Sequence, residues 1–379
     1  MTEGLARLLS GARFTVTYLL QGDEQEAERR ARDICFEQTV EFPEDITPKG
    51  PIRDQIVGRI EEMSPDGGGY RAVISYAVES AADDIPQLLN VAFGNISLKA
   101  GIRVERFDLP ESLLSGLPGP RFGRQGIREL LGVPTRPLIC AALKPMGLSV
   151  AELADQAYRF ALGGIDFIKD DHGLSNQVFS PFEERVAACC EAVHRARRET
   201  GARTLYLPNV TASTDKVHAR ARRAKALGAG GLVISPGLAG IDAVRVLASD
   251  ESIGLPLMSH PSFLGSFVTG GQNGFGHAAL FGQLMRLAGA DVTVFPNYAG
   301  RFCFTRDECA GIAHATGEGM GSFRQIFPGP GGGMTMDRAR DMLDVYGRDF
   351  VLLSGGGMHR HSADLTRNAQ YFVKMVSEL

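Results

Sequence analysis

The chain has 379 residues, of which 44% are hydrophobic and 22% are charged, which is the composition of a folded globular protein and excludes a disordered or fibrous one. The length exceeds one average domain, and it suits two domains or a large α/β barrel with an extra module. Lys and Arg total 40 against 44 for Asp and Glu, a net charge of -4, so no basic field is available for nucleic acid or anionic lipid. We therefore expect no nucleic-acid partner and no membrane partner.

The cysteines and the N-terminal residues bear on the cellular compartment. The six cysteines show neither the spacing of a CxxC metal site nor the density of a disulfide scaffold. No apolar run approaches the roughly 20 residues that a membrane span needs. Charged residues, among them Glu3 and Arg7, precede any hydrophobic stretch, so no signal peptide is visible. We predict a cytoplasmic protein.

The first 120 residues predict a small α+β domain of the ferredoxin-like type. Taken in chain order, the pattern predicts a strand at 14–20, a helix at 24–35, a strand at 71–78, a helix at 84–93 and a connector rich in Gly and Pro at 110–137. We place the domain boundary so that residues 1–120 form this domain and residues 121–379 form a second, catalytic domain.

From residue 137 onward, apolar runs typical of strands alternate with amphipathic stretches typical of helices. The expected strands are 137–145, 165–171, 204–210, 231–236, 255–260, 291–297, 324–330 and 349–357, and the expected helices include 182–200, 213–228, 273–288 and 365–378. Eight such units fit a (β/α)₈ TIM barrel better than a doubly wound sheet, which usually has fewer strands and a GxGxxG turn after the first one. The sequence therefore predicts a C-terminal (β/α)₈ barrel.

Two lysines end neighbouring strands of this predicted barrel, where barrel enzymes place their catalytic groups. Lys144 and Lys169 each follow a strongly apolar run. A buried ammonium group is costly unless it is paired or neutralised, so these lysines either form ion pairs with a nearby Asp or carry chemistry. The run Asp170-Asp171-His172 directly after Lys169 favours chemistry.

The residues after Lys169 have the types that ligate a divalent cation. Alternate residues of a strand point the same way, so Lys169 and Asp171 share one face, and His172 can join them where the strand ends. Oxygen ligands with one imidazole suit Mg²⁺ or Mn²⁺ better than Zn²⁺. A lysine can ligate a cation only as an N-carboxylated side chain, a carbamate. The alternative is that Asp170 and Asp171 cap the segment that follows.

Glycines and a histidine at the other strand ends suggest where a substrate binds. Gly331–Gly333 and Gly355–Gly357 end the seventh and eighth predicted strands, where barrels commonly hold phosphate on backbone N–H groups. Either run could also be a simple turn. His260 ends the fifth strand, where it is either a buried core histidine or a hydrogen-bonding partner of a substrate hydroxyl.

Together these residues resemble the large subunit of RuBisCO, and within that family the RuBisCO-like proteins of form IV. The segment 163–172, followed by Asn-Gln-Val-Phe at 176–179, is similar to the strand-two motif of the family. Leu-Lys-Pro-Met-Gly-Leu at 143–148 resembles the strand-one motif, and 208–211 and 259–261 resemble those of strands three and five. The resemblance covers nearly the whole chain.

This resemblance implies a role for each matching residue. Lys169 would carry CO₂ as a carbamate and would hold one Mg²⁺ per subunit together with Asp171 and His172, while Lys144 would be a general acid and base. His260 would act in catalysis and substrate binding. Further substrate-binding residues would be Asn209, Asn297 and the two glycine runs, together with Glu37 and Asn95, which lie in stretches that a neighbouring subunit contributes to the site. The protein would then be a homodimer with a shared active site.

The departures from the family argue against carboxylase activity. His172 stands in place of a glutamate ligand, Met146 replaces the second lysine of strand one, and Pro261 stands where carboxylases have a phosphate-binding arginine. No lysine occurs between Lys225 and Lys374, so the mobile lysine with which carboxylases hold CO₂ has no counterpart. We do not expect carboxylation of ribulose bisphosphate.

We therefore expect a Mg²⁺-dependent enzyme that forms an enolate or enediolate from a phosphorylated keto sugar or keto sugar acid. It would finish as an isomerase or enolase, as in methylthio-sugar salvage, or as a decarboxylase of a sugar acid phosphate such as 3-oxo-isoapionate phosphate. The histidine at the metal site and the single lysine of strand one favour the sugar-acid branch. Two other functions stay open: a Schiff-base aldolase that uses Lys144 or Lys169, and a non-catalytic sugar-phosphate sensor.

Overall fold

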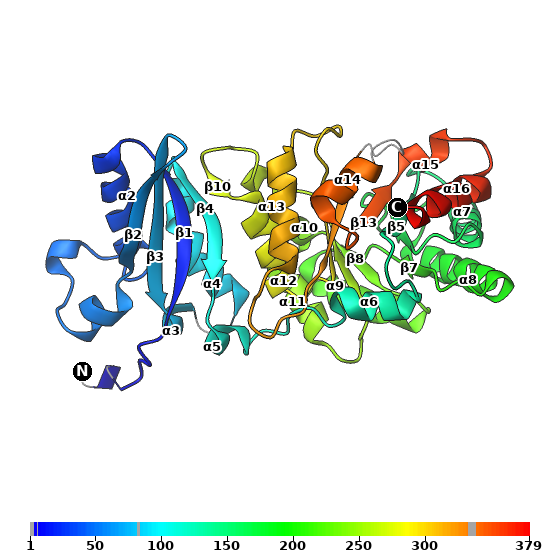
Figure 1. Cartoon of the computed structure of the whole chain (residues 1–379). Coiled ribbons are helices and arrows are strands. Elements are labelled where there is room, and N and C mark those ends of the chain that lie inside the picture. Colours follow the sequence, from blue (N-terminus) through cyan, green and yellow to red (C-terminus); the bar gives the residue numbers. More distant parts are fainter. Residues whose placement is uncertain (1–3, 6, 82–83, 333–338) are drawn as a thin grey trace. The chain divides into compact units, whose positions relative to one another are not determined.

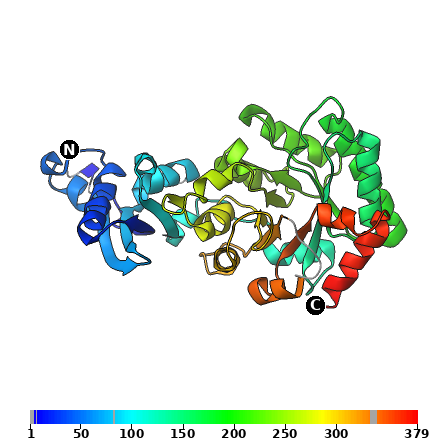
Figure 2. The same cartoon turned by 90° about the horizontal axis from the view of Figure 1, so that it is seen from above.

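The computed structural model describes the whole chain except residues 1–3, 6, 82–83 and 333–338. The chain divides into two compact units (Figures 1 and 2). The first unit consists of Met1–Leu117, Leu264–Leu287 and Gly319–Phe323, and the second consists of Pro118–Phe263, Ala288–Glu318 and Arg324–Leu379. The domain boundary expected at residue 120 stays a prediction. In the structure, Leu264–Leu287 and Gly319–Phe323 also belong to the first unit.

The first unit is built on a five-stranded sheet in the order β10-β4-β1-β3-β2. Its strands are β1 (Arg13–Gln21), β2 (Arg59–Asp66), β3 (Gly69–Ala77), β4 (Ile102–Asp108) and β10 (Gly274–Phe275). All neighbours pair antiparallel except β10, which pairs parallel with β4. Period-2 alternation explains the central strand, since Phe14, Val16, Tyr18 and Leu20 of β1 are at most 1% exposed.

Short helices complete the first unit. Its α-helices are α2 (Glu24–Glu37), α3 (Val78–Ala81), α4 (Ile85–Phe93), α5 (Glu111–Leu114) and α12 (Met285–Leu287). Its other helical turns are η1 (Glu44–Ile46), η2 (Ile52–Ile56), η3 (Asn95–Leu98), η4 (Leu264–Phe267) and η5 (Ala278–Leu284). Side chains of Asp23 and Asp84 accept hydrogen bonds from the first turns of α2 and α4, which fixes where these helices begin.

Several expectations for the helices and strands were wrong. The sequence reading missed β2 and β4. β2 is almost wholly exposed and so lacks an apolar face. β4 has an alternating pattern, with Ile102, Val104 and Phe107 buried, that could have indicated a strand. The helix expected over 273–288 begins instead as β10 and continues as η5 and α12, because Gly274 and Phe275 extend the first unit's sheet. The connector expected over 110–137 contains α5 and a helix of the second unit, α6 (Gly123–Leu131), which buries Ile127 and Leu131.

The second unit contains the eight predicted parallel strands. They are β5 (Leu138–Leu143), β6 (Phe167–Asp170), β7 (Leu205–Leu207), β8 (Leu232–Ile234), β9 (Leu257–Ser259), β11 (Val292–Pro296), β12 (Phe327–Gly331) and β13 (Val351–Ser354). They pair in the orders β13-β5-β6-β7 and β12-β11-β9-β8. A bridge between Asn209 and Val233 joins the two sheets, and β12 lies against β13. The predicted barrel beside an N-terminal α+β domain is confirmed.

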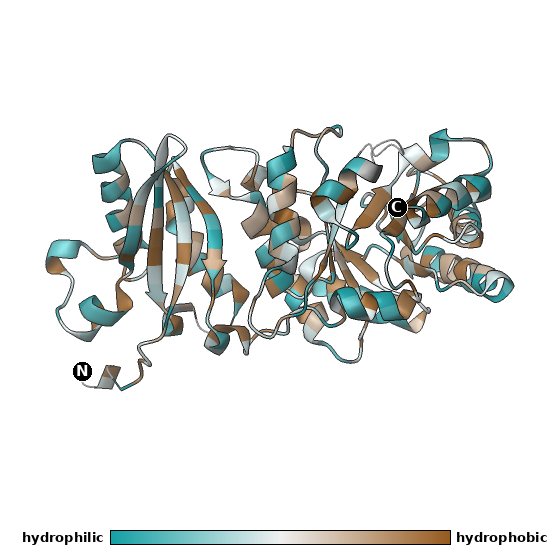
Figure 3. Cartoon of the chain, viewed as in Figure 1, coloured by the Kyte–Doolittle hydropathy of each residue, from teal (hydrophilic) through white to brown (hydrophobic). Residues whose placement is uncertain are grey.

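Helices surround this barrel (Figure 1). Besides α6 they are α7 (Val150–Leu162), α8 (Phe182–Thr200), α9 (Thr214–Ala226), α10 (Pro236–Ala239), α11 (Ile241–Ser249), α13 (Arg306–Gly317), α14 (Ala339–Tyr346), α15 (Gly356–Arg360) and α16 (Leu365–Ser377). Figure 3 shows apolar strands inside and hydrophilic outer faces on these helices. In the part of the chain that the structure describes, no helix has the length and apolarity needed to cross a membrane.

The barrel interior is an apolar core that ends in the polar residues of the strand ends. The core consists of Leu138, Cys140, Phe167, Leu205, Leu207, Val233, Met258, Val292, Val294, Phe327 and Val351, with Ile127 and Leu131 of α6. Inward-facing residues alternate along each strand. The rows of core residues therefore continue into Lys144 after β5, Lys169 on β6, Asp171 directly after β6, and His260 after β9.

A buried carboxylate ties α6 to the start of two barrel strands. Asp291, fully buried just before β11, accepts hydrogen bonds from the backbone N–H groups of Phe122 and Gly123 at 2.8 Å and of Leu257 at 3.0 Å. Burial raises the pKa of Asp291 to about 6, although the three N–H donors oppose this shift. The carboxyl group therefore binds a proton more readily in the folded chain than in the unfolded one.

We predict that this carboxyl group makes stability fall as the pH rises. Because the folded pKa of about 6 exceeds the ordinary value of 3.8, the stabilisation is complete below pH 3.8 and is lost as the pH rises through 6. The difference between the two values corresponds to about 3 kcal/mol. The measurement is the unfolding midpoint of the wild type minus that of Asp291→Asn, from pH 4 to 7. A difference that does not fall with pH would contradict the raised pKa.

Candidate active site

Lys169 is a fully buried lysine at the end of β6. Its side chain is 1% exposed, and its Nζ donates a hydrogen bond to the backbone oxygen of Asp170 at 2.9 Å. Burial lowers the pKa of Lys169, and the positive charge of Lys144 lowers it further, while the carboxylate of Asp171 opposes the shift. Lys169 therefore loses its proton more readily than an exposed lysine does.

Asp171 lies between two nitrogen groups. Its Oδ1 is 2.6 Å from the Nζ of Lys144 and 3.3 Å from the Nδ1 of His172. Burial alone would raise the pKa of Asp171, but hydrogen bonds with His172 and Lys144 and the charge of Lys169 hold it well below its usual value. The structure thus brings together the two lysines, the aspartate and the histidine that the sequence reading selected.

His260 joins this cluster from the fifth barrel strand. Its ring stacks on that of His172, with centroids 4.6 Å apart and planes 10° apart, and its Nδ1 is 2.9 Å from the Oγ of Ser262. Burial lowers the pKa of His260 well below its usual value, and the charges of Lys169 and His172 lower it further. His260 is therefore neutral at neutral pH and can donate or accept a hydrogen bond.

Asp170 points to the other side of β6 and does not belong to the cluster. Its fully buried carboxylate accepts hydrogen bonds from the Nε of Arg185 at 3.1 Å, the hydroxyl of Tyr206 at 2.7 Å and the backbone N–H of Asn209 at 3.0 Å. Arg185, itself fully buried, also donates to the backbone of Ser175 and Ser180. Asp170 therefore fixes β6 against its neighbours from behind the site.

Asn209 holds the loop that carries His172. Its Nδ2 donates to the backbone oxygens of His172 at 3.0 Å and Leu174 at 2.8 Å, and its Oδ1 accepts from the N–H of Thr211 at 3.1 Å. The side chain is 1% exposed. Because these protein groups occupy its amide, we now expect Asn209 to position the loop; contact with substrate stays a prediction.

Gln156 is a positioning residue that the sequence reading missed. Its Nε2 donates to the backbone oxygen of Lys144 at 2.6 Å, and its Oε1 accepts from the backbone N–H of Lys144 at 3.2 Å. This pair of bonds anchors the strand end to α7. The sequence analysis predicted no helix at this position and no motif contains Gln156, so nothing in the sequence signalled its role.

The described glycines of the two runs lie at or directly after the ends of β12 and β13. Gly331 ends β12 beside the side chain of Leu353 on β13, and Gly332 follows with a φ of +92°. Gly333 lies outside the described residues. Gly355 precedes α15, and a Cβ at this position would be 3.3 Å from the Cε of Lys144. Residues 356–357 begin a short helix and do not extend the strand, which corrects the expected strand over 349–357.

Asn297 and His359 follow β11 and β13 and contact residues of the surrounding helices. The Oδ1 of Asn297 accepts a hydrogen bond from the Tyr346 hydroxyl of α14, and its Nδ2 has no partner among the described residues. A role for Asn297 in substrate binding stays a prediction. His359, which the sequence reading passed over, is half-buried against Phe160, and burial lowers its pKa, with the charge of Lys144 contributing.

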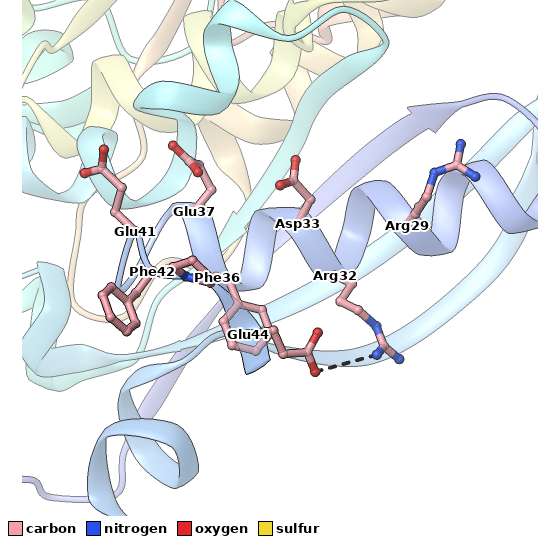
Figure 4. A pocket seen from close by; sticks show the side chains of 9 residues that line it. Arg29, Arg32, Asp33, Phe36, Glu37, Glu41, Phe42 and Glu44 are labelled. Atoms are coloured by element: carbon pink, nitrogen blue, oxygen red, sulfur yellow. Dashed lines mark ion pairs between the residues drawn. The ribbon is translucent and has the colours of Figure 1, made fainter. Parts of the chain in front are cut away.

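Glu37 and Asn95 lie together in the first unit. The Nδ2 of Asn95 donates to the Oε1 of Glu37 at 3.0 Å. Glu37 lines a cavity of about 420 Å³ at the end of α2. Figure 4 shows the carboxylates of Asp33, Glu37 and Glu41 pointing the same way, away from the ion pair of Arg32 and Glu44. Their expected contribution to a neighbouring subunit's active site stays a prediction.

The residues of the cluster fit a divalent cation under one condition. The Asp171 Oδ1 and the His172 Nδ1 lie 3.3 Å apart, close enough to ligate one ion, and the ammonium group of Lys144 takes the place of a cation against Asp171. No group of three or more His, Cys, Asp or Glu residues that could hold a metal occurs among the described residues. Lys169 could supply a third ligand only as a carbamate, so its part in a metal site stays a prediction.

The comparisons with known proteins identify the family of this chain. Residues 123–370 match the family model for the ribulose bisphosphate carboxylase large chain, catalytic domain. The chain belongs to the RuBisCO large-chain family. The crystal structure of the RuBisCO-like protein from Rhodopseudomonas palustris is 37% identical, covers 97% of this chain and 98% of that one, and superimposes with a TM-score of 0.86. The predicted resemblance to RuBisCO-like proteins is confirmed.

Two relatives in this family have named activities. A 5-methylthioribulose-1-phosphate isomerase of Rhodospirillum rubrum is 35% identical over 96% of each chain. A 2,3-diketo-5-methylthiopentyl-1-phosphate enolase of Geobacillus thermodenitrificans is 34% identical over 94% of this chain and 90% of its own. Solved RuBisCO structures that match this chain are dimeric or octameric. This RuBisCO-like protein therefore has homologues that are enzymes acting on sugar phosphates.

We predict that Arg185→Met destabilises the fold severely, because it leaves the fully buried carboxylate of Asp170 without its cation. Loss of one partner of a buried ion pair costs about 3–5 kcal/mol. Urea unfolding measures the change. The matched control is Arg198→Met, since Arg198 forms an exposed pair with Glu191, and this variant should unfold like the wild type. Equal losses in both variants would show that Asp170 does not depend on Arg185.

Proposed function

We propose that this RuBisCO-like protein forms an enolate or enediolate from a phosphorylated keto sugar or keto sugar acid. The observation that carries the proposal is the convergence of Lys144 and His172 on Asp171, beside the buried Lys169, at the carboxyl ends of the barrel strands. The family membership and the named relatives support a sugar-phosphate substrate. The absence of a lysine between 225 and 374 supports an activity other than carboxylation.

We propose that Lys169, Asp171 and His172 hold one Mg²⁺ per subunit. Carbamate formation joins the carbon of CO₂ to the neutral Nζ of Lys169 and releases one proton, and the lowered pKa of Lys169 favours the neutral amine that this reaction needs. Replacing the Lys169 ammonium by a carbamate and adding a divalent ion leaves the net charge of the cluster unchanged. When bound, Mg²⁺ would supply positive charge that polarises a substrate carbonyl group.

The remaining residues of the cluster move protons and orient the substrate. The Nζ of Lys144 carries the proton between substrate carbons, and the two hydrogen bonds from Gln156 fix the backbone that carries it. His260, neutral and held by Ser262, donates a hydrogen bond to a substrate hydroxyl or carbonyl oxygen. The glycines of the two runs leave room for the phosphate to approach the backbone.

The reaction can end in two ways from the same intermediate. If a C–H bond is broken, reprotonation at another carbon or oxygen gives an isomerase or an enolase. If a C–C bond to a carboxylate is broken, CO₂ leaves and one proton enters, which gives a decarboxylase. The relatives named above support the first outcome. The nitrogen ligand of His172 and the single lysine of strand one distinguish this chain and support the second.

We predict that Lys144→Met abolishes proton transfer. Turnover of a panel of phosphorylated keto sugars and keto sugar acids in D₂O should place solvent deuterium in the product, and the variant should slow this by about 10²- to 10⁴-fold. Mass spectrometry measures the deuterium, and release of CO₂ separates decarboxylation from isomerisation. The control is Lys225→Met, an exposed lysine on α9. An imine trapped by borohydride on Lys144 or Lys169 would instead establish a Schiff-base aldolase.

We predict that metal binding depends on both CO₂ and Lys169. Because Mn²⁺ replaces Mg²⁺ in oxygen-rich sites and is paramagnetic, electron paramagnetic resonance can follow its binding without turnover. Bicarbonate should tighten Mn²⁺ binding by the wild type by about tenfold or more, the loss typical for disturbed metal sites. In Lys169→Met it should have no effect. Binding by this variant as tight as by the wild type would refute the carbamate ligand.

A further inference from the structure

The turn formed by His172, Gly173 and Leu174 is held at each of its carbonyl groups. The Nδ2 of Asn209 donates to the backbone oxygens of His172 at 3.0 Å and Leu174 at 2.8 Å. The Nε2 of Gln177 donates to the backbone oxygen of Gly173 at 2.7 Å. Because three consecutive carbonyl groups accept hydrogen bonds from side chains, this turn is a fixed surface of the site.

Met146, from the loop after β5, lies against this turn. A Cβ at Gly173 would be 2.7 Å from the Cε methyl group of Met146 and 3.6 Å from the Oδ2 of Asp171. The φ of Gly173 is not positive, so its backbone conformation does not require glycine. The missing side chain instead leaves the space in which the methyl group of Met146 lies, near the carboxylate of Asp171.

Met146 is accessible from solvent together with the charged groups of the site. It is 52% exposed, and the side chains of Lys144 and His172 are 32% and 45% exposed. A single exposed methionine is ordinary on a protein surface, but this one follows Lys144 by two residues and contacts the residue after His172. A ligand that reaches both Lys144 and His172 therefore also meets the thioether group of Met146.

We propose that Met146 determines substrate specificity by forming an apolar wall of the site, against which an uncharged carbon segment of the substrate packs. A thioether group has no charge and no hydrogen-bond donor, so a phosphate or carboxylate group placed against it would lose water without gaining a partner. The unbranched, polarisable methionine side chain adapts to apolar groups of irregular shape. The inference rests on the proposed function, since it names the kind of group that the substrate of that site carries.

The position of Met146 also bears on the charge of the substrate. Met146 stands where the strand-one motif of the family has its second lysine. A methionine side chain is unbranched like that of lysine but has no ammonium group, so this wall offers no cation to a second anionic group. The substrate is therefore a monophosphate with an uncharged segment where it passes Met146. A keto sugar monophosphate fits this wall, whereas the carboxylate of a keto sugar acid would have to turn away from it.

Binding of alkyl phosphates to the full-length protein, measured by isothermal titration calorimetry, tests the proposal without turnover. From ethyl to pentyl phosphate, each added methylene group that packs on Met146 should tighten binding by up to about fourfold, the effect of one buried CH₂ group. Met146→Ala should remove most of this dependence on chain length. Met146→Lys should bind pentane-1,5-diyl bisphosphate more tightly than pentyl phosphate, which reverses the order expected for the wild type. The matched control is Met375→Ala, a partly buried methionine of α16 whose variant should behave like the wild type.

A second variant displaces the side chain of Met146 without replacing it. Gly173→Ala keeps every charge of the site and suits the backbone, but its methyl group must push the Cε of Met146 aside. It should weaken the dependence on chain length as Met146→Ala does. The double variant should show no further loss, because both changes remove the same contact. Additive losses, or a dependence on chain length that survives in Met146→Ala, would overturn the inference.

The apolar wall and the proposed reaction can fail separately. If binding depends on chain length in the wild type and loses this dependence in both variants, while no substrate takes up deuterium, the wall is supported and the proposed reaction is refuted. If Lys144→Met abolishes proton transfer but chain length has no effect on binding, the wall is refuted and the reaction stands. A wild type that binds none of the alkyl phosphates also refutes the wall.

Discussion

The buried ion pair of Asp170 and Arg185 is the interaction on which the site depends. Both side chains are fully buried, and Asp170 also binds Tyr206 and the backbone of Asn209. A carboxylate in this position is tolerated only because each of its oxygens is satisfied. The pair fixes the end of β6 from outside the barrel, so that the residues on either side of Asp170 face inward. The hydrogen bonds of Asp170 therefore hold Lys169 and Asp171 in place, although Asp170 itself faces away from the site.

The site concentrates charge where the barrel is otherwise apolar. Its residues are Lys144, Lys169, Asp171, His172 and His260. Two lysines face one aspartate, and each group shifts the others: the pKa of Asp171 is held down, and those of Lys169 and His260 are lowered mainly by burial. An excess of positive charge in a partly buried site favours the binding of anions and the stabilisation of a developing negative oxygen.

Much of the second unit could be predicted from the sequence, because its strands are apolar runs of regular spacing with little exposed surface. The positions of Lys144, Lys169 and Asp171 followed from period-2 alternation and from the position of catalytic groups in barrels. The first unit was harder, because β2 is exposed and β10 has only two residues. A hydropathy pattern cannot reveal a strand that forms because it pairs with a neighbouring strand and not because its own side chains are buried.

The sequence alone determined which residue types stand at each strand end, since local periodicity and motif spacing are properties of the chain itself. Only the tertiary structure decided which of them meet. It turned Asp170 away from Asp171, used the amide of Asn209 to hold a loop, and brought Gln156 to Lys144. These contacts join residues that are 12 to 37 positions apart. Hydrogen bonds of this kind depend on distances and directions that exist only after the strands and helices have packed.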